Sequence, residues 1–314
     1  MSKVLVFPGQ GSQKVGMGKE LFDSFSVARD IFEIVDDSLS QHLSKLIFEG
    51  PLEELTLTEN AQPAIMTVSI ALLETLRKEY GEQFKEVKYC AGHSLGEYTS
   101  LVATDCLDLM EVAKLLKIRG KSMQSALQPG KGSMAALIGI DIHQVKEIIK
   151  NVPSNLICEI ANYNSINQIV ISGDTEAIDM VLDYTKKNKI KGVKLMVSAP
   201  FHCGYMKETA LKLEKSFKTL NFRSPSVPIV CNYSAKPNLD LDDLKKSLFM
   251  QTFSTVRWYE SIEFMLHKGT EQFIELGNGS TLTNMIKRMN SDNQFEAISI
   301  STIQNIENYV ERNK

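Results

Sequence analysis

The pattern Gly92-His93-Ser94-Leu95-Gly96 lies between a short apolar segment at 87–91 and a helical pattern that begins near residue 97. A G-x-S-x-G pentapeptide that joins a strand to a helix is typical of a nucleophile elbow, a sharp, strained turn that lifts a serine hydroxyl into a cleft. The helix that follows such a turn directs its N-terminal amides at developing negative charge. We therefore expect an α/β fold with Ser94 as its nucleophile; the alternative is that Ser94 is an ordinary turn residue.

Strand and helix patterns alternate on both sides of a segment that has its own order of elements. Before this segment we expect a strand at 3–7 and helices at about 26–48, 61–79, 97–104 and 108–127. The segment begins at the breaker 128–132 and ends before Pro200, and its order is β-α-β-β-α-β, which is typical of a ferredoxin-like fold. Its expected elements are strands at 134–140, 156–162, 168–172 and 193–198 and helices at 143–150 and 175–188. Further strands are expected at 228–232 and 271–276.

This order predicts two parts, which agrees with about 150 residues per domain in a chain of 314. Residues 1–127 and 199–314 are expected to form a discontinuous, α/β-hydrolase-like catalytic domain with a parallel-sheet core. Residues 128–198 are expected to form an inserted, ferredoxin-like subdomain.

A serine nucleophile needs a base, and His202 is the best placed of the five histidines. It follows a strand and a proline turn, where active-site loops of α/β folds lie, and it comes after Ser94, as in the chain order of hydrolases. His93 is adjacent to Ser94, and side chains of adjacent residues diverge. The others are assigned to surface helices or a helix end: His42, His143 and His267. The alternative is that His202 is a loop residue with no role. We find no acidic residue to complete a catalytic triad with Ser94 and His202, because Asp174 is predicted to cap a helix.

Arg119 lies on the apolar side of its predicted helix, although the same helix has a face rich in lysine. The positions that share its side are apolar: Val112, Leu115, Leu116 and Met123. A buried guanidinium without a partner is costly, so Arg119 must pair with an internal carboxylate, reach the helix edge, or bind a carboxylate of a ligand. Its planar fork suits a ligand carboxylate. Spacing alone leaves these alternatives open.

Composition and the remaining motifs exclude several classes of protein. Thirty-five basic and 38 acidic residues give a net charge of −3, which argues against electrostatic binding of nucleic acid along the whole chain. No apolar run is long enough for a membrane helix, and the five scattered cysteines favour free thiols in a cytoplasmic protein without a metal site. The glycine-rich stretch 9–18 matches neither the dinucleotide fingerprint nor a P-loop.

Six motifs in order resemble the malonyl-CoA:acyl carrier protein transacylase family over nearly the whole chain. They are FPGQGSQ at 7–13, TENAQPA at 58–64, GHSLGEY at 92–98, RGKSMQ at 119–124, APFHC at 199–203, and the stretch from Gln251 to Val256-Arg257-Trp258. The resemblance implies an acyltransferase with malonyl-CoA as substrate, no tightly bound cofactor, and a ping-pong reaction that ends on the phosphopantetheine thiol of acyl carrier protein.

The resemblance also implies roles for individual residues. Ser94 would carry the acyl group, and His202 would be its base, oriented by a backbone carbonyl near Gln251. Gln10 and the amide of Leu95 would form the oxyanion hole. Arg119 would hold the free carboxylate of the malonyl group. Gln62 would line the pocket, and Phe201 and Leu95 fit a preference for malonyl over methylmalonyl groups.

Other readings remain. Lys186, Lys187, Lys189, Lys191 and Lys194 could help dock an acidic carrier protein, or they could form a solvated helix end. The same catalytic residues would serve a discrete acyltransferase of a polyketide synthase, and a serine thioesterase or esterase would share the elbow and the base. A non-catalytic scaffold would not need these residues. We expect a monomer that binds neither nucleic acid nor membrane.

Overall fold

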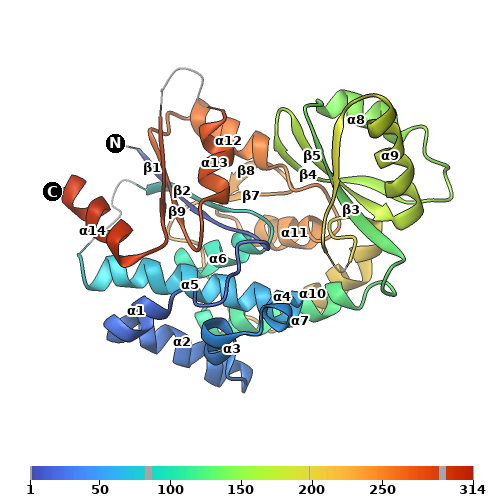
Figure 1. Ribbon diagram of the computed structural model, residues 1–314. Helices are drawn as coiled ribbons and strands as arrows, with labels where there is room; N and C mark the ends of the chain where they lie inside the picture. Colours follow the sequence, from blue (N-terminus) through green and yellow to red (C-terminus); the bar gives the residue numbers. More distant parts are fainter. Residues whose placement is uncertain (1, 82–86, 198, 290–294, 314) are drawn as a thin grey trace.

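The computed structural model describes residues 2–81, 87–197, 199–289 and 295–313. In these ranges the chain forms a six-stranded sheet and a separate four-stranded sheet (Figure 1). The structure therefore confirms a mixed α/β fold. No helix of the described ranges is long and apolar enough to cross a membrane.

The six-stranded sheet has the order β10-β9-β1-β2-β7-β8, and its strands run parallel except for the edge strand β8. Strands with apolar side chains in succession form such sheets because both faces are covered by helices. β1 shows this: Val4 and Val6 pack into one core, and Leu5 and Phe7 pack into the other. The bounds are β1 Lys3–Phe7, β2 Val87–Gly92, β7 Ile229–Cys231, β8 Lys236–Asn238, β9 Gln272–Leu276 and β10 Glu296–Ile300.

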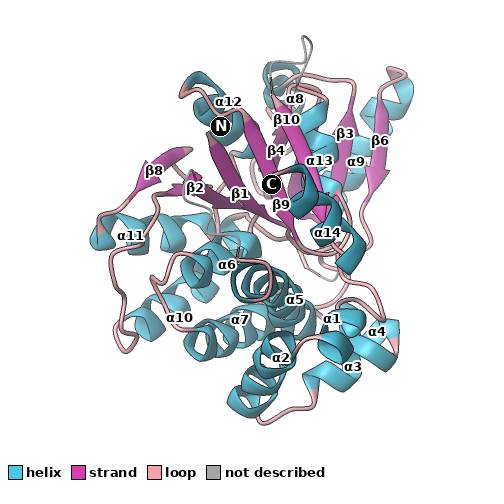
Figure 2. Cartoon of the chain, turned by 90° about the vertical axis from the view of Figure 1, so that its left-hand side faces the viewer, coloured by secondary structure: helices cyan, strands magenta, loops and turns pink. Residues whose placement is uncertain are grey.

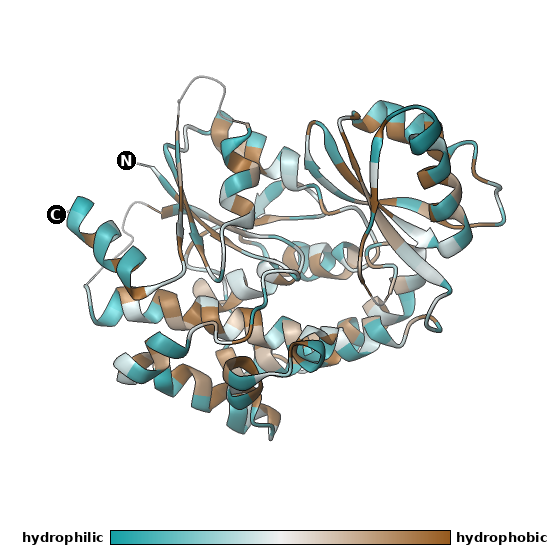
Figure 3. Ribbon diagram, viewed as in Figure 1, coloured by the Kyte–Doolittle hydropathy of each residue, from teal (hydrophilic) through white to brown (hydrophobic). Residues whose placement is uncertain are grey.

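Helices cover both faces of this sheet (Figure 2). One face packs against α5 (Thr58–Lys78) and α6 (Leu95–Ala103), with α7 (Leu109–Gln124) and α2 (Ser26–Leu39) behind them. The other face packs against α12 (Trp258–His267) and α13 (Thr281–Lys287). Hydrophobic residues concentrate in the strands and in the inward sides of these helices (Figure 3). The other helices outside the segment of the four-stranded sheet are α1 Lys19–Ser24, α3 Leu43–Glu49, α4 Leu52–Thr56, η1 Gly204–Met206, α10 Lys207–Phe217, α11 Leu241–Gln251 and α14 Ile303–Arg312.

The four-stranded sheet is antiparallel, with the order β4-β5-β3-β6. Along the chain its elements follow the predicted order β-α-β-β-α-β, which is confirmed. They are β3 Gly132–Ile138, α8 Ile142–Ile149, β4 Cys158–Ser165, β5 Gln168–Asp174, α9 Thr175–Lys187 and β6 Lys191–Lys194. The helices cover one face of this sheet, away from the six-stranded sheet (Figure 1).

The structure corrects some expected boundaries. The single helix expected at 26–48 is two helices, because Ser40 adopts a left-handed conformation (φ 49°) and ends α2. The strand expected at 193–198 is shorter and earlier. Only 191–194 pair with β3; Leu195 donates one further hydrogen bond to Met134 before the chain turns. Position 198 lies outside the described residues.

Candidate active site

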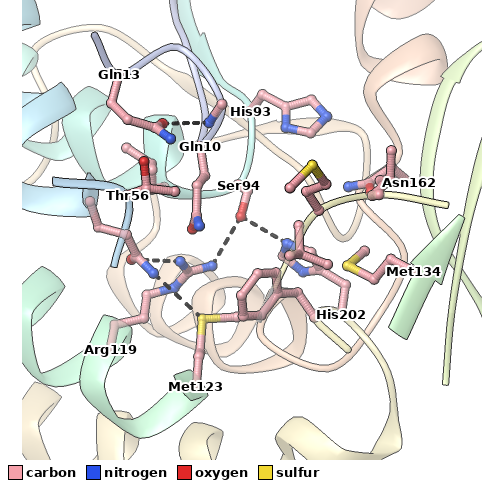
Figure 4. Close-up of a pocket in the computed structure, with 17 residues that line it drawn as sticks. Gln10, Gln13, Thr56, His93, Ser94, Arg119, Met123, Met134, Asn162 and His202 are labelled. Carbon is pink, nitrogen blue, oxygen red and sulfur yellow. Dashed lines mark hydrogen bonds between the residues drawn. The ribbon is translucent and has the colours of Figure 1, made fainter. Parts of the chain in front are cut away.

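A cavity of about 170 Å³ lies where the carboxyl ends of β1 and β2 face the four-stranded sheet. Ligands of open α/β sheets bind at this edge, because loops from several strands meet there. The loops that follow β1 and β2 contribute to its lining, and Met134 and Asn162 of the four-stranded sheet face them (Figure 4). The residues that line it include Gln10, Gln62, His93, Ser94, Leu95, Arg119, Met123, Met134, Asn162, Met196, Phe201 and His202.

Ser94 lies on a strained turn between β2 and α6. Its φ of 54° and ψ of −106° are unusual for a residue with a side chain, and such strain persists only where neighbours fix it. The two flanking glycines permit the turn. A Cβ on Gly92 would lie 1.9 Å from the carbonyl carbon of Gly96, and one on Gly96 would lie 2.2 Å from the oxygen of Phe7. The sequence pattern at 92–96 therefore reflects steric necessity.

Asn232, in the loop after β7, holds the turn in place. Its Oδ1 accepts a hydrogen bond from the backbone N–H of Ser94 at 2.8 Å, and its Nδ2 donates to the carbonyl of Gly92 at 2.7 Å. The side chain is fully buried, so both bonds are shielded from water. The sequence analysis did not identify Asn232; a polar residue directly after a buried strand was the available signal.

His202 brings its ring to the serine from a segment 108 residues away. Nε2 lies 2.8 Å from Oγ of Ser94, and Nδ1 lies 2.8 Å from the backbone oxygen of Gln251. A carbonyl only accepts, so Nδ1 carries the proton and Nε2 is free to accept one from the serine. Burial, reinforced by the positive charge of Arg119, lowers the pKa of His202 to about 3. The ring is therefore neutral at physiological pH.

Arg119, on α7, is 1% exposed and points into the cavity beside Ser94 (Figure 4). It donates to Oε1 of Gln62 at 2.7 Å, to Oε1 of Gln251 at 3.0 Å and to Oγ of Ser94 at 3.2 Å. All three acceptors are neutral, and its guanidinium has no ion pair with a carboxylate in the described ranges. Of the alternatives left open by spacing, the structure thus gives neither an internal salt bridge nor a side chain that reaches the surface.

Two backbone N–H groups are candidates for stabilising an oxyanion near Ser94. Leu95 is the first residue of α6, and the first N–H groups of a helix have no partner within it. Gln10 lies in the loop after β1 and lines the cavity beside Ser94 (Figure 4). Its side chain is already engaged, since Nε2 donates to Oγ1 of Thr58 at 3.2 Å. The backbone N–H of Gln10 is therefore the better candidate donor.

Two further residues assigned from the sequence, Phe201 and Gln62, line this cavity. Phe201 is 8% exposed, and Gln62 bridges Arg119 to Met123. His93 turns away from the serine: its Nε2 contacts Oδ1 of Asn164 at 2.9 Å. Asp174 is the N-cap residue of α9, as predicted. Its carboxylate makes no hydrogen bond to that helix and accepts instead from Ile157 N–H and Tyr205 O–H. No group of three His, Cys, Asp or Glu among the described residues could hold a metal ion.

Comparisons with known proteins agree over the whole length. A family model described as the acyl transferase domain matches residues 4–312. The chain is 40% identical to a malonyl CoA-acyl carrier protein transacylase of Bacillus subtilis (strain 168), covering 98% of this chain and 96% of that protein. A crystal structure of an acyl-carrier-protein-S-malonyltransferase from Bartonella henselae matches with a TM-score of 0.95 and 42% identity, covering 99% of both chains. A malonyl-transacylase solved in complex with its type II PKS acyl-carrier protein matches with a TM-score of 0.94 and 34% identity, covering 99% of this chain and 100% of that one.

Proposed function

This chain belongs to the acyl transferase family and, within it, to the malonyl CoA-acyl carrier protein transacylases, and on that premise we propose how its residues carry out the transfer. The enzyme moves a malonyl group from malonyl-CoA to the phosphopantetheine thiol of acyl carrier protein. We assign the covalent intermediate to Ser94, and we propose that the malonyl units supply fatty acid synthesis.

In the first half-reaction, Oγ of Ser94 attacks the thioester carbonyl and its proton passes to Nε2 of His202, 2.8 Å away. The backbone N–H groups of Leu95 and Gln10 stabilise the oxyanion; loss of one such donor costs roughly 10²–10³ in kcat. The carbon–sulfur bond then breaks, and the imidazolium returns the proton to the sulfur of CoA. The carbonyl of Gln251 holds the ring by Nδ1 throughout.

In the second half-reaction, the thiol of the carrier protein's phosphopantetheine gives its proton to Nε2 of His202 and attacks the malonyl-serine. The carbon–oxygen bond to Ser94 breaks, and the proton returns to Oγ. Apart from the two thiol substrates, every step in this proposal uses groups of this chain.

Arg119 is proposed to bind the free carboxylate of the malonyl group. The observation that carries this proposal is a buried guanidinium 3.2 Å from the nucleophile with only neutral hydrogen-bond acceptors. A substrate carboxylate supplies the missing counter-charge and suits the guanidinium fork. It also offsets the positive charge that helps to lower the pKa of His202, so the bound substrate makes the base stronger.

The test is the mass of the intact protein after brief incubation with malonyl-CoA or acetyl-CoA. We expect a malonyl adduct on the wild type, none on Ser94→Ala, and a loss on Arg119→Ala that is larger for malonyl than for acetyl. Release of CoA without an adduct would instead indicate a thioesterase or esterase. Absence of both adduct and CoA release would refute the assignment of the site.

The match to a malonyl-transacylase solved with a type II PKS acyl-carrier protein keeps a polyketide role as the second candidate. The two roles share the chemistry and differ in the carrier protein. Measured kcat/KM values with carrier proteins of fatty acid synthesis and of polyketide synthesis would separate them.

For the architecture, we propose that 128–198 form a ferredoxin-like subdomain inserted into an α/β-hydrolase-like domain made of 1–127 and 199–314. The four-stranded sheet order and the elbow between β2 and α6 support this division.

We further propose a monomer whose carrier protein docks at the end of α9. Exposed lysines gather there: Lys186, Lys187, Lys189, Lys191 and Lys194. Lys194 already pairs with Asp179, so the test is charge reversal of the first four. An unchanged KM for the carrier protein would refute docking.

A further inference from the structure

Glu97 is a buried carboxyl group close to the reacting atoms, and the proposed steps do not use it. It lies in the first turn of α6, three residues after Ser94, and its side chain has no exposure to solvent. Burial raises the pKa of Glu97 to about 7, although hydrogen bonds and the charge of Arg119 oppose this. A buried carboxyl group is costly unless hydrogen bonds compensate for its lost hydration.

One oxygen of Glu97 receives two hydrogen bonds from different parts of the chain. Oε2 accepts from the backbone N–H of Asn232 at 2.9 Å and from Nε2 of Gln251 at 3.0 Å. Asn232 is the residue that holds the elbow, and Gln251 is the last residue of α11. Glu97 therefore links Asn232, which holds the turn at the nucleophile, to Gln251, which contacts both Arg119 and His202.

The side-chain amide of Gln251 has only one orientation that satisfies its neighbours. Its Nε2 donates to Oε2 of Glu97 and also to the backbone oxygen of Ser94 at 2.8 Å, while its Oε1 accepts from Nη2 of Arg119. A rotation of the amide by 180° would set its NH₂ group against the guanidinium and its oxygen against two acceptors. Unsatisfied buried polar groups disfavour that state strongly.

Resting on the proposed function of Arg119, we propose that Glu97 is a positioning residue for malonyl recognition: it fixes the amide of Gln251 so that its oxygen holds Arg119 beside Ser94. The hydrogen bond depends on the length of the Glu97 side chain and on its acceptor oxygen. His202 is held by the backbone oxygen of Gln251, so the positioning acts on the carboxylate clamp more than on the base.

The test compares three substitutions by their rates of Ser94 acylation with malonyl-CoA and with acetyl-CoA, which has no free carboxylate. Glu97→Gln keeps an acceptor oxygen at the same reach. Glu97→Asp keeps the carboxyl group but withdraws its oxygens by about 1.5 Å, one carbon–carbon bond. Glu97→Met keeps the volume and removes the acceptor. Thr99→Val, on the same helix and also buried, is the control because Thr99 has no hydrogen bond to Gln251.

We expect Glu97→Met to lower the ratio of malonyl to acetyl kcat/KM at least tenfold, mainly through the KM for malonyl-CoA. Glu97→Asp should lower it by a smaller factor, whereas Glu97→Gln and Thr99→Val should stay within about threefold of the wild type. Gln251→Met should reproduce the effect of Glu97→Met. The double variant should lose no more than Gln251→Met alone, because Glu97 acts on Arg119 only through Gln251. Glu97→Asp keeps the test decisive if Glu97→Met does not fold.

An equal loss for both acyl groups would overturn the proposal and assign Glu97 a purely structural role. Additive effects with Gln251→Met, or a ratio kept by Asp and lost by Gln, would also overturn it. The proposed function is judged separately. If Arg119→Ala discriminates malonyl from acetyl and the Glu97 variants do not, only the role of Glu97 is wrong.

Discussion

Nη2 of Arg119 lies 3.2 Å from Oγ of Ser94, so the buried cation and the nucleophile share a hydrogen bond. The same hydroxyl donates to Nε2 of His202. On the proposed role of Arg119, we expect a bound carboxylate to compete for Nη2 and to leave the serine hydrogen-bonded to its base alone. Substrate recognition and release of the nucleophile would then be linked at one atom.

Substitution of Arg119 by Lys tests whether geometry or charge holds the carboxylate. Lysine keeps the positive charge but cannot bond Gln62 and Gln251 with separate nitrogens. We expect kcat/KM for malonyl-CoA to fall by roughly 10- to 100-fold, and that for acetyl-CoA to change much less. Steady-state kinetics with both substrates measure this. Arg223→Lys, at an exposed pair with Asp108, is the control; equal effects of the two substitutions would contradict the prediction.

Substitution of Gly92 by Ala should disrupt the elbow, because the added Cβ would lie 1.9 Å from backbone atoms of Gly96 that cannot move independently. We expect a loss of more than about 4 kcal/mol in the free energy of unfolding, or no folded protein. Urea unfolding measures it. Gly204→Ala is the control, since its Cβ would meet atoms only at 3.6 Å. A folded Gly92→Ala protein of wild-type stability would show that the turn is not fixed by these contacts.

Substitution of Glu97 by Gln should change how stability depends on pH. Burial raises the pKa of Glu97 from 4.5 to about 7, so between these values the folded chain holds a proton that the unfolded chain has released. Stability therefore falls as pH rises through this window in the wild type, by about 3 kcal/mol in total. Glutamine has no such proton. The groups that face Glu97 are Arg119, Tyr98 and Cys231, and they remain unchanged in the variant.

The measurement is urea unfolding of both proteins at pH 5, 6, 7 and 8. The free-energy advantage of Glu97→Gln should grow over this range. A constant difference would mean that Glu97 titrates near its ordinary pKa in the folded protein.

His202 should remain neutral across the working range of the enzyme. Its pKa is lowered to about 3, chiefly by burial, so the folded ring gains a proton only in strong acid, whereas the unfolded ring does so near 6.5. The ¹⁵N chemical shifts of the ring should therefore show the Nδ1–H tautomer from pH 5 to pH 8. The urea-unfolded chain is the reference. A protonated ring in the folded protein at pH 5 would contradict the burial argument.

The sequence predicts most of the fold because apolar periodicity and the breaker at 128–132 are local signals. The break at Ser40 escaped prediction, since the residues around it include neither glycine nor proline. Local spacing also placed Arg119 on the apolar side of its helix, and the structure shows that the side chain is buried. It could not show that its neighbours are neutral, because Gln62 and Gln251 come from helices 57 residues before and 132 residues after it.

The support of the site was harder to predict for the same reason. Glu97 and Asn232 contact each other across 135 residues. A carboxyl group in a helix whose other residues are small or apolar was a sign in the sequence that the side chain of Glu97 is buried. Its partner Gln251 could not be predicted, because the position of Gln251 depends on where α11 ends and how that helix packs.

The separation of the site residues along the chain also determines when activity arises during synthesis. Ser94 leaves the ribosome first, His202 follows 108 residues later, and Gln251 is 157 residues behind the serine. At about 5–20 residues per second, the nucleophile exists for roughly 8–30 s before the residue that orients its base is made. On the proposed mechanism, we expect a growing chain to be unable to consume malonyl-CoA through that interval, because Ser94 has no oriented base until α11 docks. Completion of the fold would then be a condition for the chemistry.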